Sequence, residues 1–472
     1  MKLSEYVIEF IEKITDSVFF LSGGGIMHLV DSLGRSKKIK SYCVHHEQAA
    51  ATAAEGYARI KNDIGVILVT SGPGATNAIT GIAGAWLDSI PLLVISGQVK
   101  TDNIAPRKNG IPTVRAIGFQ ELNVIDLVKP ITKYAVTVEK KEDIRYHLEK
   151  ALYLAKSGRP GPVWLEIPLD IQGEEINIET LKKYLQPPSI KYNIPISDVV
   201  SKLGNAKKPL LMVGNGIRLA HGEKILNKLV DRLKINVVSA LFTADDLIPN
   251  DYPKYLGRQG MWGNETANWA IDNCDLLLVI GERLQLTQLS YDYKNFATQA
   301  FKIMVDIDEG ELHKKTLDID LPINADAKIF LEELNKQKIK LNCWNVKIKP
   351  MDLNLYSTNE RYVNVYNFLE ELNKNLNKQN IVTSDAMAAV ASHQTIKIKS
   401  GQRFIVNAGL GQMGQGLPMA IGACIANNKK PTICIEGDGS LMLNIHELQT
   451  ILHHKLPIII FILNNGGYYS IR

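Results

Sequence analysis

The segment GDGS at residues 437–440 has the residue types of a phosphate-binding turn. It follows an apolar run, TICIE, and precedes a helical stretch and a second apolar run that ends in Asn464 and Asn465. Gly437 and Gly439 allow a tight turn in which phosphate oxygens approach backbone N–H groups. A helix beginning near Ser440 would direct its positive end at the same anion. The spacing therefore predicts an anion site at the end of this strand.

A divalent cation fits the same segment. Mg²⁺ prefers oxygen ligands and takes only one or two protein carboxylates. Asp438 supplies a carboxylate, Asn465 an amide oxygen and Gly467 a backbone carbonyl. A GDGS turn alone looks the same as an ordinary Asp-Gly turn capped by Ser. With the distal Asn pair, it favours a diphosphate held through Mg²⁺.

A second segment of chemical interest covers residues 41–98. Glu47 follows a strand-like run in SYCVHHEQ, and SGPGATN follows the next strand at residues 71–77. A lone Glu after a strand is usually a helix cap or a surface residue, and Gly-Pro-Gly is a common turn. These residues gain a chemical meaning only in combination with the GDGS segment.

The combined pattern resembles the thiamine diphosphate (ThDP) enzymes of the acetolactate synthase type. The resemblance implies that Glu47 contacts the aminopyrimidine ring of ThDP and favours the imino tautomer that removes the C2 proton. In AGLGQMGQGLPMAIGA it places Met413 where a bulky side chain bends the cofactor, whereas a core role is the alternative. The other cofactor-binding residues that it implies are Gly24, Gly72, Gly74, Asn77, Gly411, Gly437, Asp438, Gly439, Ser440, Asn465 and Gly467, with Asp438, Asn465 and Gly467 as metal ligands.

The fate of the substrate depends on nearby proton donors. After a 2-oxo acid loses carbon dioxide, the remaining unit is either protonated or joined to a second carbonyl compound. Simple decarboxylases of this superfamily carry a His pair after the SGQ strand, whereas residues 107–135 contain no His. The GFQE stretch resembles acetolactate synthases and makes Gln120 a candidate for positioning the substrate. We therefore expect carboligation of a pyruvate-like 2-oxo acid.

Three positions depart from the acetolactate synthase pattern. Thr287 stands at a second Arg position after Arg283, Leu169 replaces a Lys, and Met387-Ala388-Ala389 replaces a GQH motif. The first two changes remove cations that would pair with an acceptor carboxylate. An aldehyde or a keto-sugar nucleotide is then an alternative acceptor, and another ThDP decarboxylase, lyase or sugar-modifying carboligase is the alternative activity.

The middle of the chain leaves FAD open as a further cofactor. LGRQGMWGNETANWAI is similar to a synthase segment near FAD, and KIMVDID ends in acidic residues that could meet a ribose. A nicotinamide oxidoreductase is not supported, because neither Gly23-Gly24-Gly25 nor Gly214-Asn215-Gly216 forms a full GxGxxG fingerprint.

Apolar runs alternate with helical stretches throughout, which predicts an α/β fold of three doubly wound parallel-sheet domains. We expect a pyrimidine-binding domain at 1–172, a central Rossmann-like domain at 190–337 and a diphosphate-binding domain at 353–472. The last block stops at Arg472 directly after a strand, so we expect it to be truncated. A non-catalytic paralog or fragment is thus the alternative from another class. The resemblance also implies a homodimer or homotetramer.

The composition excludes several other classes. A net charge of +5, from 54 Lys and Arg against 49 Asp and Glu spread along the chain, gives no nucleic-acid signal. The five cysteines form no CxxC pair, and no apolar run reaches the length of a membrane span. The start MKLSEYVIEFIEKI is not a secretory signal. We expect a cytoplasmic enzyme without a membrane anchor.

Overall fold

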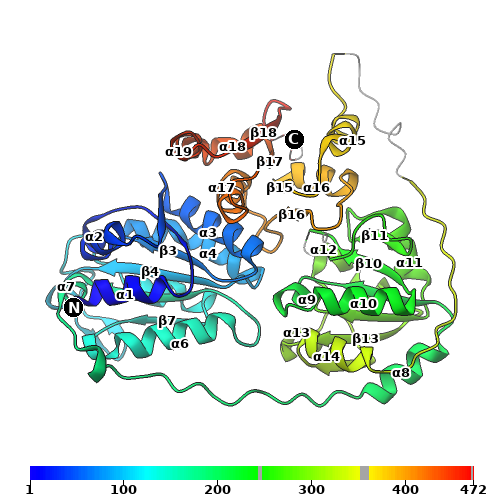
Figure 1. The fold of residues 1–472 in the computed structure, drawn as a ribbon, viewed down its shortest axis with the longest axis horizontal. Helices are drawn as coiled ribbons and strands as arrows, with labels where there is room; N and C mark the ends of the chain where they lie inside the picture. The colour runs from blue at the N-terminus through cyan, green and yellow to red at the C-terminus, as the bar shows by residue number, and fades with distance from the viewer. Residues whose placement is uncertain (243–246, 351–360, 469–470, 472) are drawn as a thin grey trace. The chain divides into compact units, whose positions relative to one another are not determined.

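The computed structural model describes residues 1–242, 247–350, 361–468 and 471. The chain forms two compact units (Figure 1). The first combines residues 1–188 with 407–472, and the second comprises 189–406. The first unit is therefore built from two distant stretches of sequence.

A six-stranded sheet organises residues 1–188, with the order β2-β1-β3-β4-β8-β7. All neighbouring strands are parallel. Every residue of the central strands β3, β4 and β8 is buried, as expected for a sheet covered on both faces. The strands are β1 Ser17–Phe20, β2 Lys40–Cys43, β3 Gly65–Val69, β4 Leu92–Gln98, β7 Tyr134–Thr137 and β8 Val163–Pro168.

Two helices of this unit begin where strands end. Helix α3 (Glu47–Lys61) follows β2, and α4 (Pro73–Leu87) follows β3. Ligands bind at this edge of open parallel sheets. The remaining elements of this stretch are α1 Leu3–Ile11, η1 Gly24–Ile26, α2 Met27–Arg35, η2 Thr101–Asn103, the antiparallel pair β5 Arg107–Lys108 and β6 Ile111–Pro112, α5 Val124–Val128, η3 Lys129–Ile131, η4 Lys141–Asp143, α6 Ile144–Lys156, α7 Leu169–Gly173 and η5 Ile178–Thr180.

Residues 407–472 complete the first unit with the parallel pair β17 and β18. Helix α17 (Gly416–Ala426) packs directly on α3. A Cβ at Gly422 would lie 1.7 Å from the carbonyl oxygen of Ala53, and one at Gly56 would lie 2.4 Å from that of Met419. Only glycine allows the two backbones to meet so closely. The other elements are β17 Thr432–Gly437, α18 Asp438–Met442, η8 Ile445–Glu447, α19 Leu448–His454 and β18 Ile458–Leu463.

The second unit contains another six-stranded parallel sheet, with the order β11-β10-β9-β12-β13-β14. It also holds the parallel pair β15 and β16. Its strands are β9 Pro209–Val213, β10 Asn236–Ala240, β11 Tyr255–Gln259, β12 Leu276–Ile280, β13 Phe301–Asp306, β14 Leu321–Asn324, β15 Ile381–Ser384 and β16 Arg403–Ile405. Its helices are α8 Ile196–Asn205, α9 Gly216–Leu219, α10 Glu223–Leu233, α11 Glu265–Asn273, α12 Leu286–Leu289, η6 Tyr293–Asn295, α13 Glu309–Leu312, α14 Ala327–Asn335, α15 Val365–Asn375 and α16 Ala386–Thr395.

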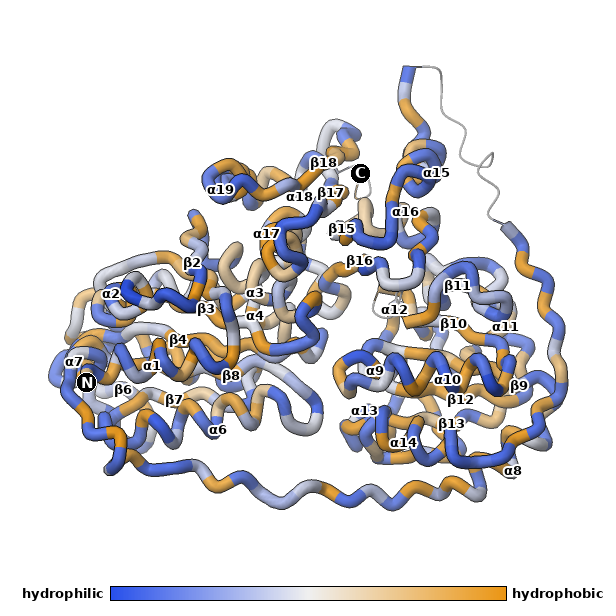
Figure 2. Tube along the Cα trace, in the orientation of Figure 1, coloured by the Kyte–Doolittle hydropathy of each residue, from blue (hydrophilic) through white to orange (hydrophobic). Residues whose placement is uncertain are grey.

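The parallel α/β fold expected from the sequence is confirmed. Apolar stretches coincide with the strands of both large sheets, whereas the outer helices alternate apolar and polar residues (Figure 2). In the part of the chain that the structure describes, no helix combines the length and the apolar character needed to cross a bilayer. All five cysteines are free thiols.

Candidate active site

Glu47 is the first residue of α3, and its side chain is held in a buried position. The residue is 6% exposed. Asn77, on α4, donates its Nδ2 hydrogen to Glu47 Oε2 over 3.0 Å. His46 caps the helix by accepting from the backbone N–H of Gln48. Two residues that the sequence singled out separately are therefore in direct contact.

Gly74 leaves room beside the other oxygen of this carboxylate. A Cβ at Gly74 would lie 3.1 Å from Glu47 Oε1 and 2.6 Å from Thr70 Cγ2. The hydroxyl of Thr70 also accepts from the backbone N–H of Gly25. Gly24 lies in the same turn, and a Cβ there would meet no heavy atom within 4 Å. The turn that contains Gly24 is thus tied to the strand end next to Glu47.

Gly72 and Gln120 meet through their backbones. Gly72 precedes α4 with φ 57° and ψ −113°, and a Cβ there would lie 2.5 Å from the carbonyl oxygen of Gln120. Gln120 has a φ of 64°, in the left-handed region that non-glycine residues seldom occupy. The neighbouring Phe119 is 88% exposed. The predicted residues Glu47, Gly72, Gly74, Asn77 and Gln120 therefore form one cluster.

We predict that Gly72→Ala destabilises the protein by roughly 2–4 kcal/mol, because the backbone conformation is strained for alanine and the new methyl group clashes with Gln120. Gly158→Ala is the control. Gly158 also has a positive φ, 58°, but a Cβ there would meet nothing within 4 Å. Its cost should stay near 1–2 kcal/mol. Urea denaturation of both variants measures the difference, and equal costs would contradict the predicted clash.

Gln98 anchors the loop that carries Gln120, and the sequence analysis did not identify it. It is the last residue of β4, and its Nε2 donates to the carbonyl oxygen of Leu122 over 2.8 Å and to Glu166 Oε1 over 3.1 Å. Thr137 donates its hydroxyl to the other Glu166 oxygen over 2.7 Å. In the sequence, Gln98 and Glu166 stand out as polar residues within or at the end of otherwise apolar strands, and this feature could have identified them.

Glu121 fixes the same loop from within. Its carboxylate accepts from the backbone N–H groups of Ala105 (2.6 Å), Ile117 (2.5 Å) and Gly118 (3.1 Å). Gln120 is thus preceded by a segment tied to Glu121 and followed by one tied to Gln98. These polar contacts help to fix the position of Gln120.

The pKa of Glu166 makes stability depend on pH. Burial raises this pKa from 4.5 to about 7, against the opposing effect of the hydrogen bonds from Thr137 and Gln98. Between these two pH values the folded state binds more protons than the unfolded state. The contribution of Glu166 to stability is therefore fully present below about pH 4.5 and is lost as the pH rises to about 7.

We therefore predict that the free energy of unfolding of wild type falls by roughly 3 kcal/mol over this pH range, and that Glu166→Gln removes this loss. The melting temperature of wild type should fall relative to that of Glu166→Gln as the pH is raised from 5 to 7. Above pH 8 the difference should stay constant. Parallel melting curves across the whole range would show that Glu166 does not titrate in this window.

The GDGS segment lies where β17 passes into α18. Helix α18 begins at Asp438, two residues earlier than expected, and has five residues. Asp438 is half-buried, and a Cβ at Gly437 would meet nothing within 4 Å. Ser440 is 2% exposed, and its hydroxyl has no hydrogen-bond partner among the residues that the structure describes. A buried hydroxyl of this kind is expected to bind a ligand oxygen.

The other two predicted metal ligands, Asn465 and Gly467, follow strand β18. Asn465 is exposed, Gly467 has a φ of 123°, and the backbone N–H of Gly466 donates to Asn464 Oδ1. A Cβ at Gly439 would touch the ring of Tyr468 at 3.0 Å. Among the described residues no three His, Cys, Asp or Glu side chains form a metal-binding group. The predicted site supplies only one such side chain, so the donor set is that of a site completed by ligand oxygens.

The loop before α17 carries Gly411 and Met413. Gly411 is exposed with a φ of 65°, and Met413 is half-buried. Met413 is therefore not a fully buried core residue. This arrangement is compatible with a side chain that contacts a ligand.

The cluster around Glu47 can position one hydrogen-bonding group of a ligand. One carboxylate oxygen is fixed by Asn77, and the other faces the space that Gly74 leaves open. A ring nitrogen placed there would share a proton with Glu47 Oε1. The turn at 437–440 can separately hold an anion and a cation.

Comparisons with known proteins give a consistent result. Residues 1–124 match "Thiamine pyrophosphate enzyme, N-terminal TPP binding domain", residues 196–334 match the central domain of these enzymes, and residues 386–472 match their C-terminal TPP binding domain. The acetolactate synthase large subunit of Cyanidium caldarium is 35% identical, over 97% of this chain and 80% of its own length. Isozyme 3 of Escherichia coli K12 is 34% identical, with 96% and 80% covered, and the probable enzyme of Methanococcus aeolicus is 34% identical, with 96% and 78% covered.

Proposed function

The chain belongs to the thiamine pyrophosphate enzymes of the acetolactate synthase large-subunit type, and we propose that it decarboxylates a pyruvate-like 2-oxo acid and joins the product to a second carbonyl compound. It is a ThDP-dependent enzyme. Bound ThDP supplies the electron sink that decarboxylation requires. The residues of the chain bind it, orient it and control protons.

The observation that carries the proposal is the contact between Glu47 and Asn77 beside Gly74. A carboxylate promotes proton exchange on the pyrimidine only when it is held in hydrogen-bonding position. Asn77 fixes one oxygen, and Gly74 leaves access to the other. Burial of Glu47 excludes water from competing for the same bond. Glu47 is thus the proposed proton-transfer residue.

The turn at 437–440 fits the diphosphate of the cofactor. Ser440 offers a buried hydroxyl that no other described residue binds, and the open space at Gly437 allows a phosphate oxygen to approach. Asp438, Asn465 and the carbonyl of Gly467 would hold Mg²⁺, which neutralises the diphosphate charge. Gly411 and Met413 would contact the cofactor from the preceding loop, and Gly24 lies in the turn tied to Thr70.

Carboligation is favoured over simple protonation because residues 107–135 provide no His as a proton donor. Gln120, held at Gly72, would orient the substrate or the acceptor. Leu169 and Thr287 provide no cation for an acceptor carboxylate. The acceptor is then an aldehyde or keto-sugar as well as a second 2-oxo acid, and decarboxylation or lyase activity is the alternative reaction.

The glycine turn of the central domain is closed by contacts within the protein. The backbone N–H of Gly214 donates to the carbonyl of Ile280 over 3.0 Å, and that of Gly216 donates to Gly281 over 2.8 Å. A Cβ at Gly214 would lie 2.2 Å from the Gly281 oxygen, so this space is filled by protein. These two N–H groups are therefore used within the protein. We assign no chemical step to FAD.

A homodimer or homotetramer in the cytoplasm completes the proposal. In the enzymes that this chain resembles, each active site is formed by the first domain of one subunit and the third domain of another. The five free thiols suit a reducing compartment. Sedimentation of the purified protein measures the assembly.

Calorimetric titration of ThDP in the presence and absence of Mg²⁺, followed by measurement of carbon dioxide release from pyruvate, tests the proposed function. Metal-dependent binding with carbon dioxide release supports it. Product analysis with pyruvate, 2-oxobutyrate, acetaldehyde and a keto-sugar nucleotide then identifies the acceptor. Absence of metal-dependent binding would instead support a non-catalytic protein.

A further inference from the structure

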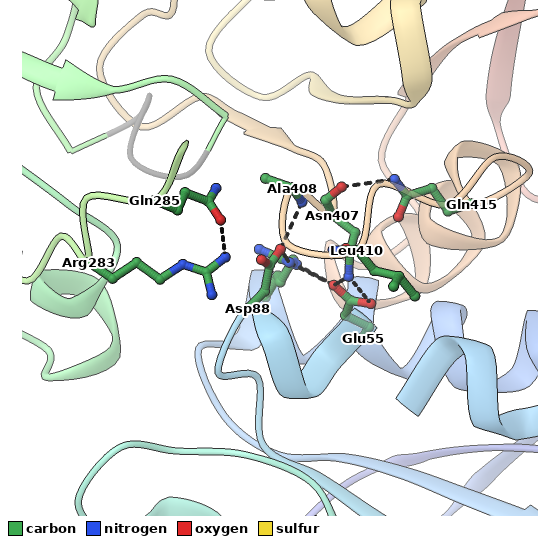
Figure 3. A network of polar contacts seen from close by, with 9 residues as sticks. Glu55, Asp88, Arg283, Gln285, Asn407, Ala408, Leu410 and Gln415 are labelled. Carbon is green, nitrogen blue, oxygen red and sulfur yellow. Dashed lines mark hydrogen bonds and ion pairs between the residues drawn. The ribbon is translucent and has the colours of Figure 1, made fainter. Parts of the chain in front are cut away.

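Asn407 forms hydrogen bonds through both ends of its side-chain amide and through its carbonyl, at the start of the loop that carries Gly411 and Met413 (Figure 3). The residue is 1% exposed. Its Nδ2 donates to Glu55 Oε1 over 3.0 Å and to Glu55 Oε2 over 3.2 Å. Its Oδ1 accepts from the backbone N–H of Leu410 over 3.2 Å, and its carbonyl accepts from Gln415 Nε2 over 3.0 Å. The side chain of Asn407 thus joins helix α3 to the start of the loop, and its backbone carbonyl binds the end of the loop.

The acceptor of this bond belongs to a buried charged cluster. Arg59 donates to Glu55 on the same helix and to Asp88 at the end of α4. Asp88 also accepts from the backbone N–H of Ala408 over 3.0 Å (Figure 3). All three charged side chains are nearly inaccessible to solvent. The loop is therefore attached to a fixed set of charges at two consecutive residues.

The far side of the loop is also anchored. Asn444, 1% exposed, donates Nδ2 to the carbonyl of Gly414, and the backbone N–H of Leu417 donates to Glu436 Oε1. Glu436 directly precedes the GDGS turn. Between these anchors the loop is less buried, and Gly411 is exposed. The anchors therefore determine the conformation of a segment that has little packing of its own.

We propose that Asn407 is a positioning residue that holds the Gly411–Met413 segment in its cofactor-binding conformation by linking it to Glu55. The role assigned to Met413 rests on the proposed function. The hydrogen bonds between Asn407 and Glu55 are observed in the structure and do not depend on that function. Helix α3 carries Glu47 at its first residue and Glu55 two turns later. The proton-transfer residue and the cofactor-bending loop are therefore positioned from one helix.

Asparagine is specifically required at this position. It presents a donor and an acceptor at equal distance from the backbone. Aspartate keeps an acceptor for Leu410 but cannot donate to Glu55, and two carboxylates at this separation repel. Alanine leaves both Glu55 and the N–H of Leu410 without this partner. The contact with Glu55 can therefore be removed without changing the size of the side chain.

A reversed pair tests the proposal. In Asn407→Asp the ThDP dissociation constant, measured by calorimetry at fixed Mg²⁺, should rise about tenfold or more, and amide hydrogen exchange of residues 408–415 should accelerate. In Asn407→Asp combined with Glu55→Gln, the amide of residue 55 can donate to the new carboxylate, and the total charge equals that of wild type. This double variant should recover binding to within about threefold.

Asn236→Ala is the matched control. Asn236 is 3% exposed and donates Nδ2 to the carbonyl of Trp344 in the second unit. It should lower stability without changing ThDP affinity or exchange in 408–415. The proposal is overturned if the double variant binds ThDP no more tightly than the sum of the two single changes predicts. It is also overturned if amide hydrogen exchange of residues 408–415 is unchanged in folded Asn407→Asp. If wild type binds no ThDP, the proposed function fails, whereas the exchange measurement still decides whether Asn407 holds the loop.

Discussion

Glu47→Gln should lower the rate of carbon dioxide release by about 10²–10⁴-fold while leaving the ThDP dissociation constant within a few-fold of wild type. The amide keeps the size of the side chain and its bond to Asn77, after rotation, but it cannot exchange a proton with the pyrimidine. A loss confined to kcat is the signature of a group that acts in the chemical step. Steady-state kinetics at saturating ThDP, together with calorimetry, separate the two quantities.

Two variants accompany this measurement. Asn77→Ala should reduce kcat less, because it frees Glu47 Oε2 without removing the carboxylate. Glu149→Gln is the control, since Glu149 lies on α6 and binds Arg145 and the backbone of Tyr184 in the same unit. It should leave kcat unchanged. Near-normal turnover in Glu47→Gln would exclude Glu47 as the proton-transfer residue.

Asp438→Ala should abolish measurable Mg²⁺-dependent binding of ThDP, with a loss of affinity of at least about 100-fold. The proposed site has one carboxylate, and without it the cation and the diphosphate are held only by neutral ligands. Activity should disappear with binding. Titrations of ThDP at several Mg²⁺ concentrations measure the effect, because a true metal ligand changes the dependence on Mg²⁺ as well as the affinity.

Asp326→Ala is the matched control for Asp438. Asp326 also follows a parallel strand, β14, and its carboxylate caps helix α14 by accepting from the backbone N–H groups of Lys328 and Ile329. Its loss should affect stability alone. Ser440→Ala should weaken binding of ThDP by about tenfold without changing the dependence on Mg²⁺. If Asp438→Ala retains metal-dependent binding, the cation is held elsewhere.

The strands with continuous apolar sequence were predictable. GVILVT, LLVIS and VWLEI correspond to β3, β4 and β8, and their complete burial explains why no polar alternation appears in the sequence. Helix α14 begins at Ala327 after its capping residue Asp326, an Asp of the kind that marks the start of a helix in a sequence. The division into three domains stays a prediction.

Three strands of the two six-stranded sheets were not predicted from the sequence. The four residues of β7 are only partly buried, so their apolar signal is weak. Strand β11 contains Gly257 and the buried Arg258, both of which read as loop residues. Strand β14 contains Pro322, which is tolerated because β14 lies at the edge of its sheet. In each case the position in the sheet determined the strand more than its own residues did.

In the candidate site, too, some features could be predicted from the sequence and others could not. Glu47, Asn77 and Gln120 were identified from motifs, but the bond from Asn77 to Glu47 and the left-handed backbone of Gln120 depend on tertiary structure. Asn407 lay beyond sequence reasoning because its partner Glu55 is 352 residues away. A buried polar residue acquires its role from a distant partner, and a single sequence does not reveal that pairing.

The contact between α3 and α17 also determines when the first unit can be completed during synthesis. Residues 189–406, which form the second unit, lie between the two halves of the first unit in the sequence. About 350 residues separate α3 from α17, so translation leaves the two helices apart for roughly 20–70 s. During that time the alanine-rich face of α3, closed in the finished protein by the backbone of α17, has no partner. The nascent chain must therefore keep this face from other chains until α17 has left the ribosome.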